Sequence, residues 1–368
     1  MRGLYIHVPF CVKKCAYCDF YSLPDRPDLV EPYINAVFKE ATHHAGLSFQ
    51  TVYLGGGTPG LLGAQGLSRL IRGLRDIFDL SRVSEATLEV NPDSTSRTLL
   101  EAARMAGINR ISIGVQSLVD FELKKAGRIH TAEQAIQSIL MAKKAGFQSI
   151  SCDVMLGLPG QNAATLISTL KKLLDLEIQH LSLYCLSIEP DTPFGLRPPF
   201  DIPSDDEQAE LYLGACEMLQ QEGFVHYEIS NFAIPGCECL HNLNYWRGGE
   251  YLGLGPAAAS HLGGKRFKNR ADLESYLTNP GGFIEDEEIL ETGQKAAEEA
   301  ILRLRLLREG LDIGELTRRF GDDVIHSLRL RLDDLVEKEL LIRSGSVYRL
   351  PDQCALVSNP ILAKVLES

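Results

Sequence analysis

The sequence predicts an α/β protein: an incomplete barrel of six β/α units, a loop-rich α+β segment and a small C-terminal winged-helix-like module. Six short apolar runs, each bounded by turn residues, alternate with amphipathic helical stretches in the first half of the chain. A polar or glycine-rich segment follows every run, as at the active-site face of a β/α barrel. The expected strands are residues 4–8, 51–54, 86–90, 110–115, 149–155 and 180–186.

These strands should be parallel, with right-handed crossovers, because enough chain for a helix separates each pair. Six units rather than eight indicate a barrel with an open side that needs a cover. We therefore place the barrel in residues 1–200, an α+β cover in 201–283 and the C-terminal module in 284–368. A proline-rich stretch, 190–203, ends the barrel, and the helix that we expect over 205–222 carries Leu211, Ala215 and Leu219 on one face.

Composition excludes several classes of protein. The formal net charge is −12, and residues 295–345 of the C-terminal module hold 10 Lys and Arg against 11 Asp and Glu, so no basic surface for nucleic acid is expected. No apolar run approaches the ~20 residues of a transmembrane helix. Nine cysteines without a secretory leader indicate a reducing compartment, and we expect a cytoplasmic protein.

Three cysteines, Cys11, Cys15 and Cys18, follow the first strand within eight residues. Thiolates bind iron–sulfur clusters, and three ligands on a four-iron cubane leave one iron free for a small molecule. A zinc site would need a fourth ligand at short spacing, and the nearby candidate, His7, lies four residues before Cys11 in a predicted strand, so zinc is the weaker interpretation. Three cysteines packed as small apolar side chains are a further alternative, which explains their close spacing poorly.

The sequence around these cysteines resembles the radical S-adenosylmethionine (SAM) superfamily, in its oxygen-independent coproporphyrinogen III oxidase-like branch. The residues that carry the resemblance are Tyr5, His7, Pro9, Phe10, Cys11, Cys15, Tyr17 and Cys18. It implies a 4Fe–4S cluster held by the three cysteines. It also implies that the fourth iron binds the amino and carboxylate groups of SAM, and that an electron donor is needed wherever SAM is cleaved.

Further positions resemble the SAM site of this superfamily. The run of glycines that includes Gly56 and Gly57, with Thr58 beside it, resembles the motif that cradles the methionine end, although a tight turn alone would also need glycine. Glu89 lies in a predicted strand, and the resemblance implies that its carboxylate helps to hold SAM. The alternative is that Glu89 is an exposed acidic residue at the end of the strand. The remaining matched positions are Tyr5, Tyr17, Gln116, Arg128 and Asp153.

Two features favour one branch of the superfamily. Phe20 stands where the coproporphyrinogen enzyme has a fourth cysteine, and the segment HNLNYW at residues 241–246 resembles the HNxxYW motif of the HemW-type heme chaperones. His241, Tyr245 and Trp246 are therefore expected to contact heme, because imidazole is a common axial ligand and aromatic rings offer flat apolar faces. The alternatives are a structural histidine, or a second metal or redox site at Cys237 and Cys239.

We therefore expect a heme chaperone that carries a SAM-bound cluster and passes heme to an acceptor hemoprotein. The alternative is a radical SAM enzyme acting on a porphyrinogen: Gln116, Arg128 and Asp153 match positions that line the SAM region, and the resemblance implies that some of these hold a second SAM in the coproporphyrinogen oxidase. A radical SAM methyltransferase or cyclopropanase would share the same core.

Overall fold

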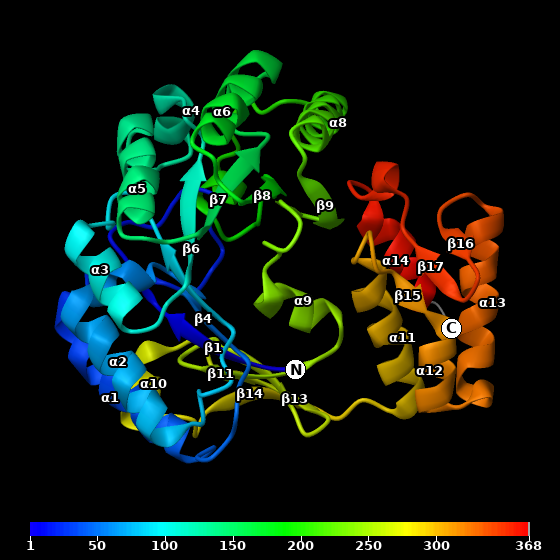
Figure 1. The fold of residues 1–368 in the computed structure, drawn as a ribbon, viewed down its shortest axis with the longest axis horizontal. Helices are drawn as coiled ribbons and strands as arrows, with labels where there is room; N and C mark the ends of the chain where they lie inside the picture. Colours follow the sequence, from blue (N-terminus) through cyan, green and yellow to red (C-terminus); the bar gives the residue numbers. More distant parts are fainter. Residues whose placement is uncertain (367–368) are drawn as a thin grey trace.

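The computed structural model describes residues 1–366 and is built around one curved sheet of twelve strands, with helices on its outer face (Figure 1). The strand order is β14-β13-β12-β11-β1-β4-β5-β6-β7-β8-β10-β9. The sheet is open, because β14 and β9 end it on opposite sides.

The six predicted strands are confirmed, and they lie next to one another in the sheet in sequence order. Every neighbouring pair among them is parallel. Alternation of apolar runs with helical stretches was therefore enough to identify these strands and their parallel pairing. The strands are β1 (Arg2–Val8), β4 (Thr51–Gly56), β5 (Glu85–Val90), β6 (Arg110–Gln116), β7 (Ser149–Leu156) and β8 (His180–Cys185).

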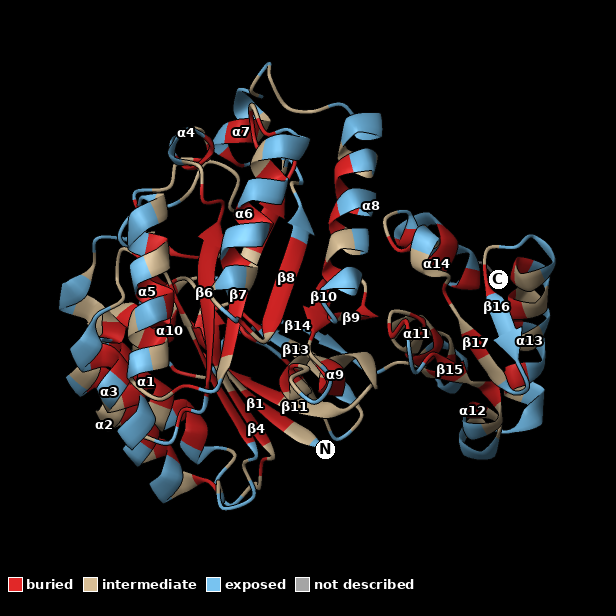
Figure 2. Ribbon diagram, turned by 45° about the horizontal axis from the view of Figure 1, so that its top comes forward, coloured by how far each residue is buried: buried red, intermediate tan, exposed pale blue. Residues whose placement is uncertain are grey.

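The helices that connect these strands, and the helices that follow β8, turn a buried face to the protein interior and an exposed face outward (Figure 2). Side-chain caps fix several of their first turns: Thr131 and Gln134 form a capping box at α5, and Ser204 and Glu207 form one at α8. Leu211, Ala215 and Leu219 are buried on α8, as predicted. The helices are α1 (Val30–Thr42), α2 (Gly63–Ile77), α3 (Arg97–Met105), α4 (Asp120–Lys125), α5 (Ala132–Lys144), α6 (Ala163–Asp175), α7 (Pro193–Leu196) and α8 (Asp205–Gln221).

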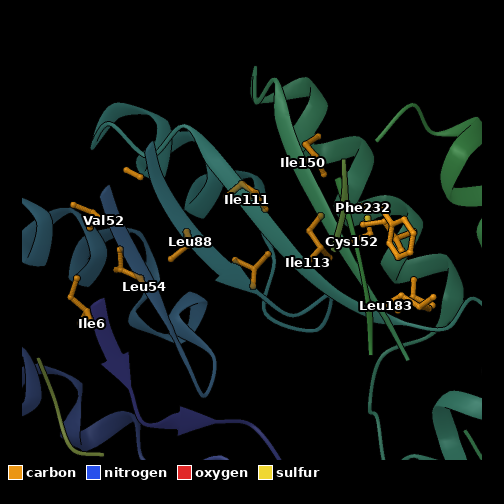
Figure 3. Close-up of a cluster of buried hydrophobic side chains, with 14 of the residues drawn as sticks. Ile6, Val52, Leu54, Leu88, Ile111, Ile113, Ile150, Cys152, Leu183 and Phe232 are labelled. Atoms are coloured by element: carbon orange, nitrogen blue, oxygen red, sulfur yellow. The ribbon is translucent and has the colours of Figure 1, made fainter. Parts of the chain in front are cut away.

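The core lies between the sheet and these helices, and apolar side chains from neighbouring strands meet there (Figure 3). Truncating one such side chain to alanine typically costs about 2–5 kcal/mol of folding free energy. This rigid layer holds the carboxyl ends of the strands in place. Figure 3 labels Ile6, Val52, Leu54, Leu88, Ile111, Ile113, Ile150, Cys152, Leu183 and Phe232.

The segment that we expected to cover the open side of the barrel instead lengthens the sheet at both edges. On one side β10 (Asn231–Ala233) pairs antiparallel with β8, and β9 (Val225–Glu228) follows it. On the other side β11 (Glu250–Leu254) lies parallel to β1. Three antiparallel strands continue from β11: β12 (Ala259–Leu262), β13 (Lys265–Asn269) and β14 (Ile284–Glu288).

The sheet therefore extends past residue 283, where we placed the start of the C-terminal module, because β14 pairs with β13. Two short helices complete this part of the chain, α9 (Leu240–Trp246) and α10 (Leu273–Thr278). Near the N-terminus, η1 (Pro27–Leu29) and η2 (Pro59–Leu62) precede α1 and α2, and β2 (Phe10–Cys11) pairs with β3 (Leu23–Pro24).

The C-terminal module stands beside the sheet, with α11 facing it (Figure 1). One strand lies between its first two helices and a hairpin follows the third, which is the order expected of a winged helix. Among residues 1–366, no helix is both long enough and apolar enough to cross a membrane. The elements are α11 (Thr292–Leu304), β15 (Leu311–Asp312), α12 (Ile313–Phe320), α13 (Asp322–Glu337), β16 (Ile342–Ser344), β17 (Val347–Arg349), η3 (Asp352–Cys354) and α14 (Ser358–Leu366).

Candidate functional site

The three N-terminal cysteines line one cavity of about 420 Å³ at the carboxyl ends of the barrel strands, which we call the cysteine cavity. Cys11 ends β2, while Cys15 and Cys18 lie in the loop that β2 and β3 close. Within residues 1–366, no three His, Cys, Asp or Glu side chains gather closely enough to bind one metal ion. A cubane has a different requirement, because each thiolate binds its own iron atom.

The glycine run ties the cysteine loop to the end of β4. The backbone amide of Gly57 donates to the Val8 carbonyl (2.9 Å), and that of Thr58 donates to the Phe10 carbonyl (2.6 Å). A side chain at position 57 has no room, since a Cβ there would lie 2.5 Å from the Phe10 oxygen. Gly56 has φ +105°, a conformation that other residues rarely adopt.

Two carboxylates reach the cysteine cavity from neighbouring strands. Glu89 accepts hydrogen bonds from the Tyr53 hydroxyl (2.6 Å) and the Gly56 amide (3.2 Å). Burial, with a contribution from the charge of Asp153, raises the pKa of Glu89 to about 7. Burial also raises the pKa of Asp153, which accepts a hydrogen bond from Ser112 (3.2 Å). Both groups would be stabilised as anions by a cationic ligand.

Arg128 brings a positive charge to the cysteine loop. Its guanidinium donates to the Cys15 sulfur (3.4 Å), to the Asn91 side-chain oxygen (2.7 Å) and to the Gly114 carbonyl (2.6 Å). A nearby guanidinium stabilises a thiolate, which is the form of cysteine that binds iron. Gln116 also lines the cavity and holds a positive φ of 63°, so its backbone bends where β6 ends.

The structure brings most of the predicted cluster and SAM residues together. Two predicted residues lie elsewhere: Thr58 is buried beneath the loop, where its hydroxyl contacts the Cys11 sulfur (3.6 Å), and Tyr5 lines a neighbouring cavity. Four further residues line the cysteine cavity that were not predicted as site residues from the sequence: Asn91, Ser112, Met155 and Tyr184. The predicted residues in the cysteine cavity are Cys11, Cys15, Tyr17, Cys18, Gly56, Gly57, Glu89, Gln116, Arg128 and Asp153.

A second and larger cavity, of about 840 Å³, adjoins the first and is rich in aromatic residues; we call it the aromatic cavity. It lies between β1, α9, the added strands β11–β13 and the helices α11 and α12 of the C-terminal module. Asp19 and Phe20 line both cavities. Phe20 therefore stands at the boundary between them.

The predicted heme residues separate in the structure. Tyr245 and Trp246 line the aromatic cavity, but His241 does not. The His241 imidazole is buried, and its two nitrogens hydrogen-bond to the hydroxyls of Thr51 (2.8 Å) and Tyr245 (2.8 Å). Burial lowers the pKa of His241 to about 3, so the ring is neutral at pH 7. Because both nitrogens are engaged, the expected contact between His241 and heme iron is not available in this arrangement.

Cys237 and Cys239 line neither cavity. Cys239 is buried, and its thiol donates to the Glu85 carboxylate (3.5 Å). The same carboxylate accepts the backbone amides of Leu240 and His241 (2.9 Å each) at the start of α9. This cysteine therefore belongs to the packing that anchors α9 to the sheet.

Comparison with known proteins identifies the class to which the fold and site belong. Residues 5–173 match the Radical SAM superfamily, and residues 292–357 match the HemN C-terminal domain. The solved structure of coproporphyrinogen III oxidase (HemN) from Escherichia coli, a radical SAM enzyme, matches with a TM-score of 0.87 at 23% identity, over 99% of this chain and 89% of that one. The fold is therefore that of a radical SAM protein with a HemN-type C-terminal domain.

Proteins of similar sequence identify the family within this class. The heme chaperone HemW of Lactococcus lactis is 34% identical over 99% of this chain and 97% of its own length. HemW of Escherichia coli is 35% identical over 98% and 97%, and HemW of Bacillus subtilis is 34% identical over 100% and 99%. The chain belongs to the HemW family.

Proposed function

We propose that this protein is a heme chaperone: it carries a SAM-bound 4Fe–4S cluster, binds heme and passes it to an acceptor hemoprotein. The observation that carries the proposal is the pair of adjoining cavities, one lined by three thiols and the other by aromatic side chains of the HNLNYW segment. Full-length similarity to heme chaperones supports the same reading.

The residues of the cysteine cavity fit the cluster and SAM. Cys11, Cys15 and Cys18 would hold the cluster, which leaves one iron for the methionine end of SAM. When bound, this pair supplies one-electron chemistry. The carboxylates of Glu89 and Asp153 would offset the positive charges of SAM, and Arg128 would offset the charge of the cluster thiolates.

The partners follow from this function. The acceptor is a heme-free hemoprotein, and an electron donor is required if SAM is cleaved. All nine cysteines are free, and a thiolate-held cluster needs a reducing compartment, so we place the protein in the cytoplasm. The acidic balance of the chain gives no reason to add nucleic acid to the partners.

An anaerobic heme titration of the cluster-reconstituted protein, followed by absorption, tests the proposal. We expect saturation at one heme per chain. A parallel incubation with SAM, a reductant and coproporphyrinogen should give no decarboxylated product, because Phe20 occupies the position of the fourth cysteine. Decarboxylation without saturable heme binding would instead establish the enzyme.

A further inference from the structure

The aromatic cavity has the size and lining of a cofactor site. Its volume of about 840 Å³ lies within the range of small-molecule pockets, which combine apolar walls with a few oriented polar groups. Its walls come from segments far apart in the chain, and aromatic rings pack against one another there. The Tyr245 and Tyr251 rings meet edge to face with centroids 4.5 Å apart, and the Tyr251 ring meets that of His261 at 6.2 Å.

One histidine of this cavity has a nitrogen free for a metal. The His7 imidazole also lines the cavity, but its nitrogens are engaged by the Tyr5 hydroxyl (3.1 Å) and the Tyr21 carbonyl (2.9 Å). The Nδ1 of His261 contacts the Gly249 carbonyl (3.3 Å). Among the residues described, the Nε2 of His261 has no hydrogen-bond partner.

This contact determines which nitrogen of His261 carries the proton. A carbonyl oxygen can only accept, so Nδ1 must be the donor and the lone pair must lie on Nε2. Metal-binding histidines show the same arrangement, in which the second ring nitrogen donates to a carbonyl or carboxylate and orients the ring. Burial also lowers the pKa of His261, which keeps the ring neutral at pH 7.

The cavity also offers positive charge for the carboxylates of a ligand. Four cationic side chains line it, and two of them are paired: Arg266 with Glu298, and Arg319 with Glu299. Lys268 and Lys295 form no ion pair within residues 1–366. An amphipathic, planar dianion such as heme would place its apolar face against the rings and its propionates toward these lysines.

We infer that heme binds in the aromatic cavity, with His261 Nε2 as an axial ligand and with Lys268 and Lys295 facing the propionates. The inference rests on the proposed heme-binding function and assigns its site. It gives His241 the role of a positioning residue, which acts through its hydrogen bond to Tyr245. The heme would then lie next to the cysteine cavity, with Phe20 at the boundary.

The test is a hemin titration of the reconstituted full-length protein, read by absorption and by electron paramagnetic resonance of the ferric iron. Four proteins are compared: the wild type, His261→Ala, His241→Phe and, as an exposed-histidine control, His326→Ala. We expect His261→Ala alone to lose the histidine-ligated spectrum and to weaken heme binding about tenfold or more. Added imidazole should restore that spectrum, because it can replace the missing ligand. It would not restore the spectrum if the substitution had only damaged the structure.

The outcomes separate this inference from the function on which it rests. If the wild type binds no heme, the proposed function fails. If the wild type binds heme and His261→Ala keeps the same spectrum, only the site assignment fails. As a second variant pair, Lys268→Met with Lys295→Met should weaken heme binding but not binding of heme dimethyl ester, which lacks the propionate charges. Equal weakening for both ligands would overturn the role of the lysines.

Discussion

Replacing Glu89 by glutamine should make the stability of the cluster-free protein less dependent on pH. The carboxyl group accepts hydrogen bonds from Tyr53 and Gly56, and burial raises its pKa from 4.5 to about 7. A carboxyl group with a raised folded-state pKa binds its proton more tightly in the folded protein. The stability of the wild type should therefore fall as the pH rises from 4.5 through about 7.

The magnitude follows from these two pKa values. The two pKa values differ by about 2.5, and this difference corresponds to about 3 kcal/mol of folding free energy at about 1.4 kcal/mol per pKa unit. At about pH 5 the wild type has already lost part of this stabilisation. Glu89 also borders a cavity that solvent can enter, which reduces the effect of burial on its pKa. We therefore expect the wild type to lose about 2 kcal/mol more unfolding free energy than Glu89→Gln between about pH 5 and about pH 8.

Urea unfolding at the two pH values measures this difference, with Glu101→Gln as the control for an exposed glutamate. The control should follow the wild type at both pH values. Parallel stability curves for the wild type and Glu89→Gln would refute the raised pKa. They would also remove the electrostatic reason for assigning Glu89 to a cationic ligand.

Three further substitutions test other parts of the site. Gly57→Ala should destabilise the fold by about 1–3 kcal/mol and lower iron incorporation, because its Cβ would meet the Phe10 oxygen; normal iron content and stability would contradict this close approach. Cys15→Ala should abolish the cluster, measured as bound iron and sulfide, while circular dichroism stays unchanged; a full cluster in this variant would contradict the ligand assignment. His241→Phe should cost about 2–4 kcal/mol in urea unfolding, because it leaves the Thr51 hydroxyl without its partner; an unchanged midpoint would show that this buried network contributes little.

The barrel and its cysteine loop could be predicted from the sequence because their signals are local. Each central strand is a short apolar run with turn residues at its ends, and three cysteines in eight residues leave few chemical alternatives. The added strands carried no comparable signal. β13 and β14 are short and mostly polar, as in KRFKN and IEDEE, and β14 is exposed along its whole length, so neither shows the buried alternation that identifies a strand.

The aromatic cavity could not be predicted for a related reason. Tyr5, Tyr245, His261 and Lys295 come from four distant segments, and only the placement of β11 beside β1 and of α11 beside the sheet brings them together. The HNLNYW motif lies in α9, and two of its residues, Tyr245 and Trp246, line this cavity. It could not reveal that His241 faces Thr51, because that contact depends on how α9 packs against β4.

Heme transfer is the most direct test of the central claim. The heme-loaded, cluster-reconstituted protein is mixed with a heme-free acceptor hemoprotein, and the absorption and activity of the acceptor are followed after the two proteins are separated. We predict that the acceptor gains heme faster than it does from the same concentration of free heme. If the acceptor gains no heme, or gains it at the rate for free heme, the protein is not a chaperone.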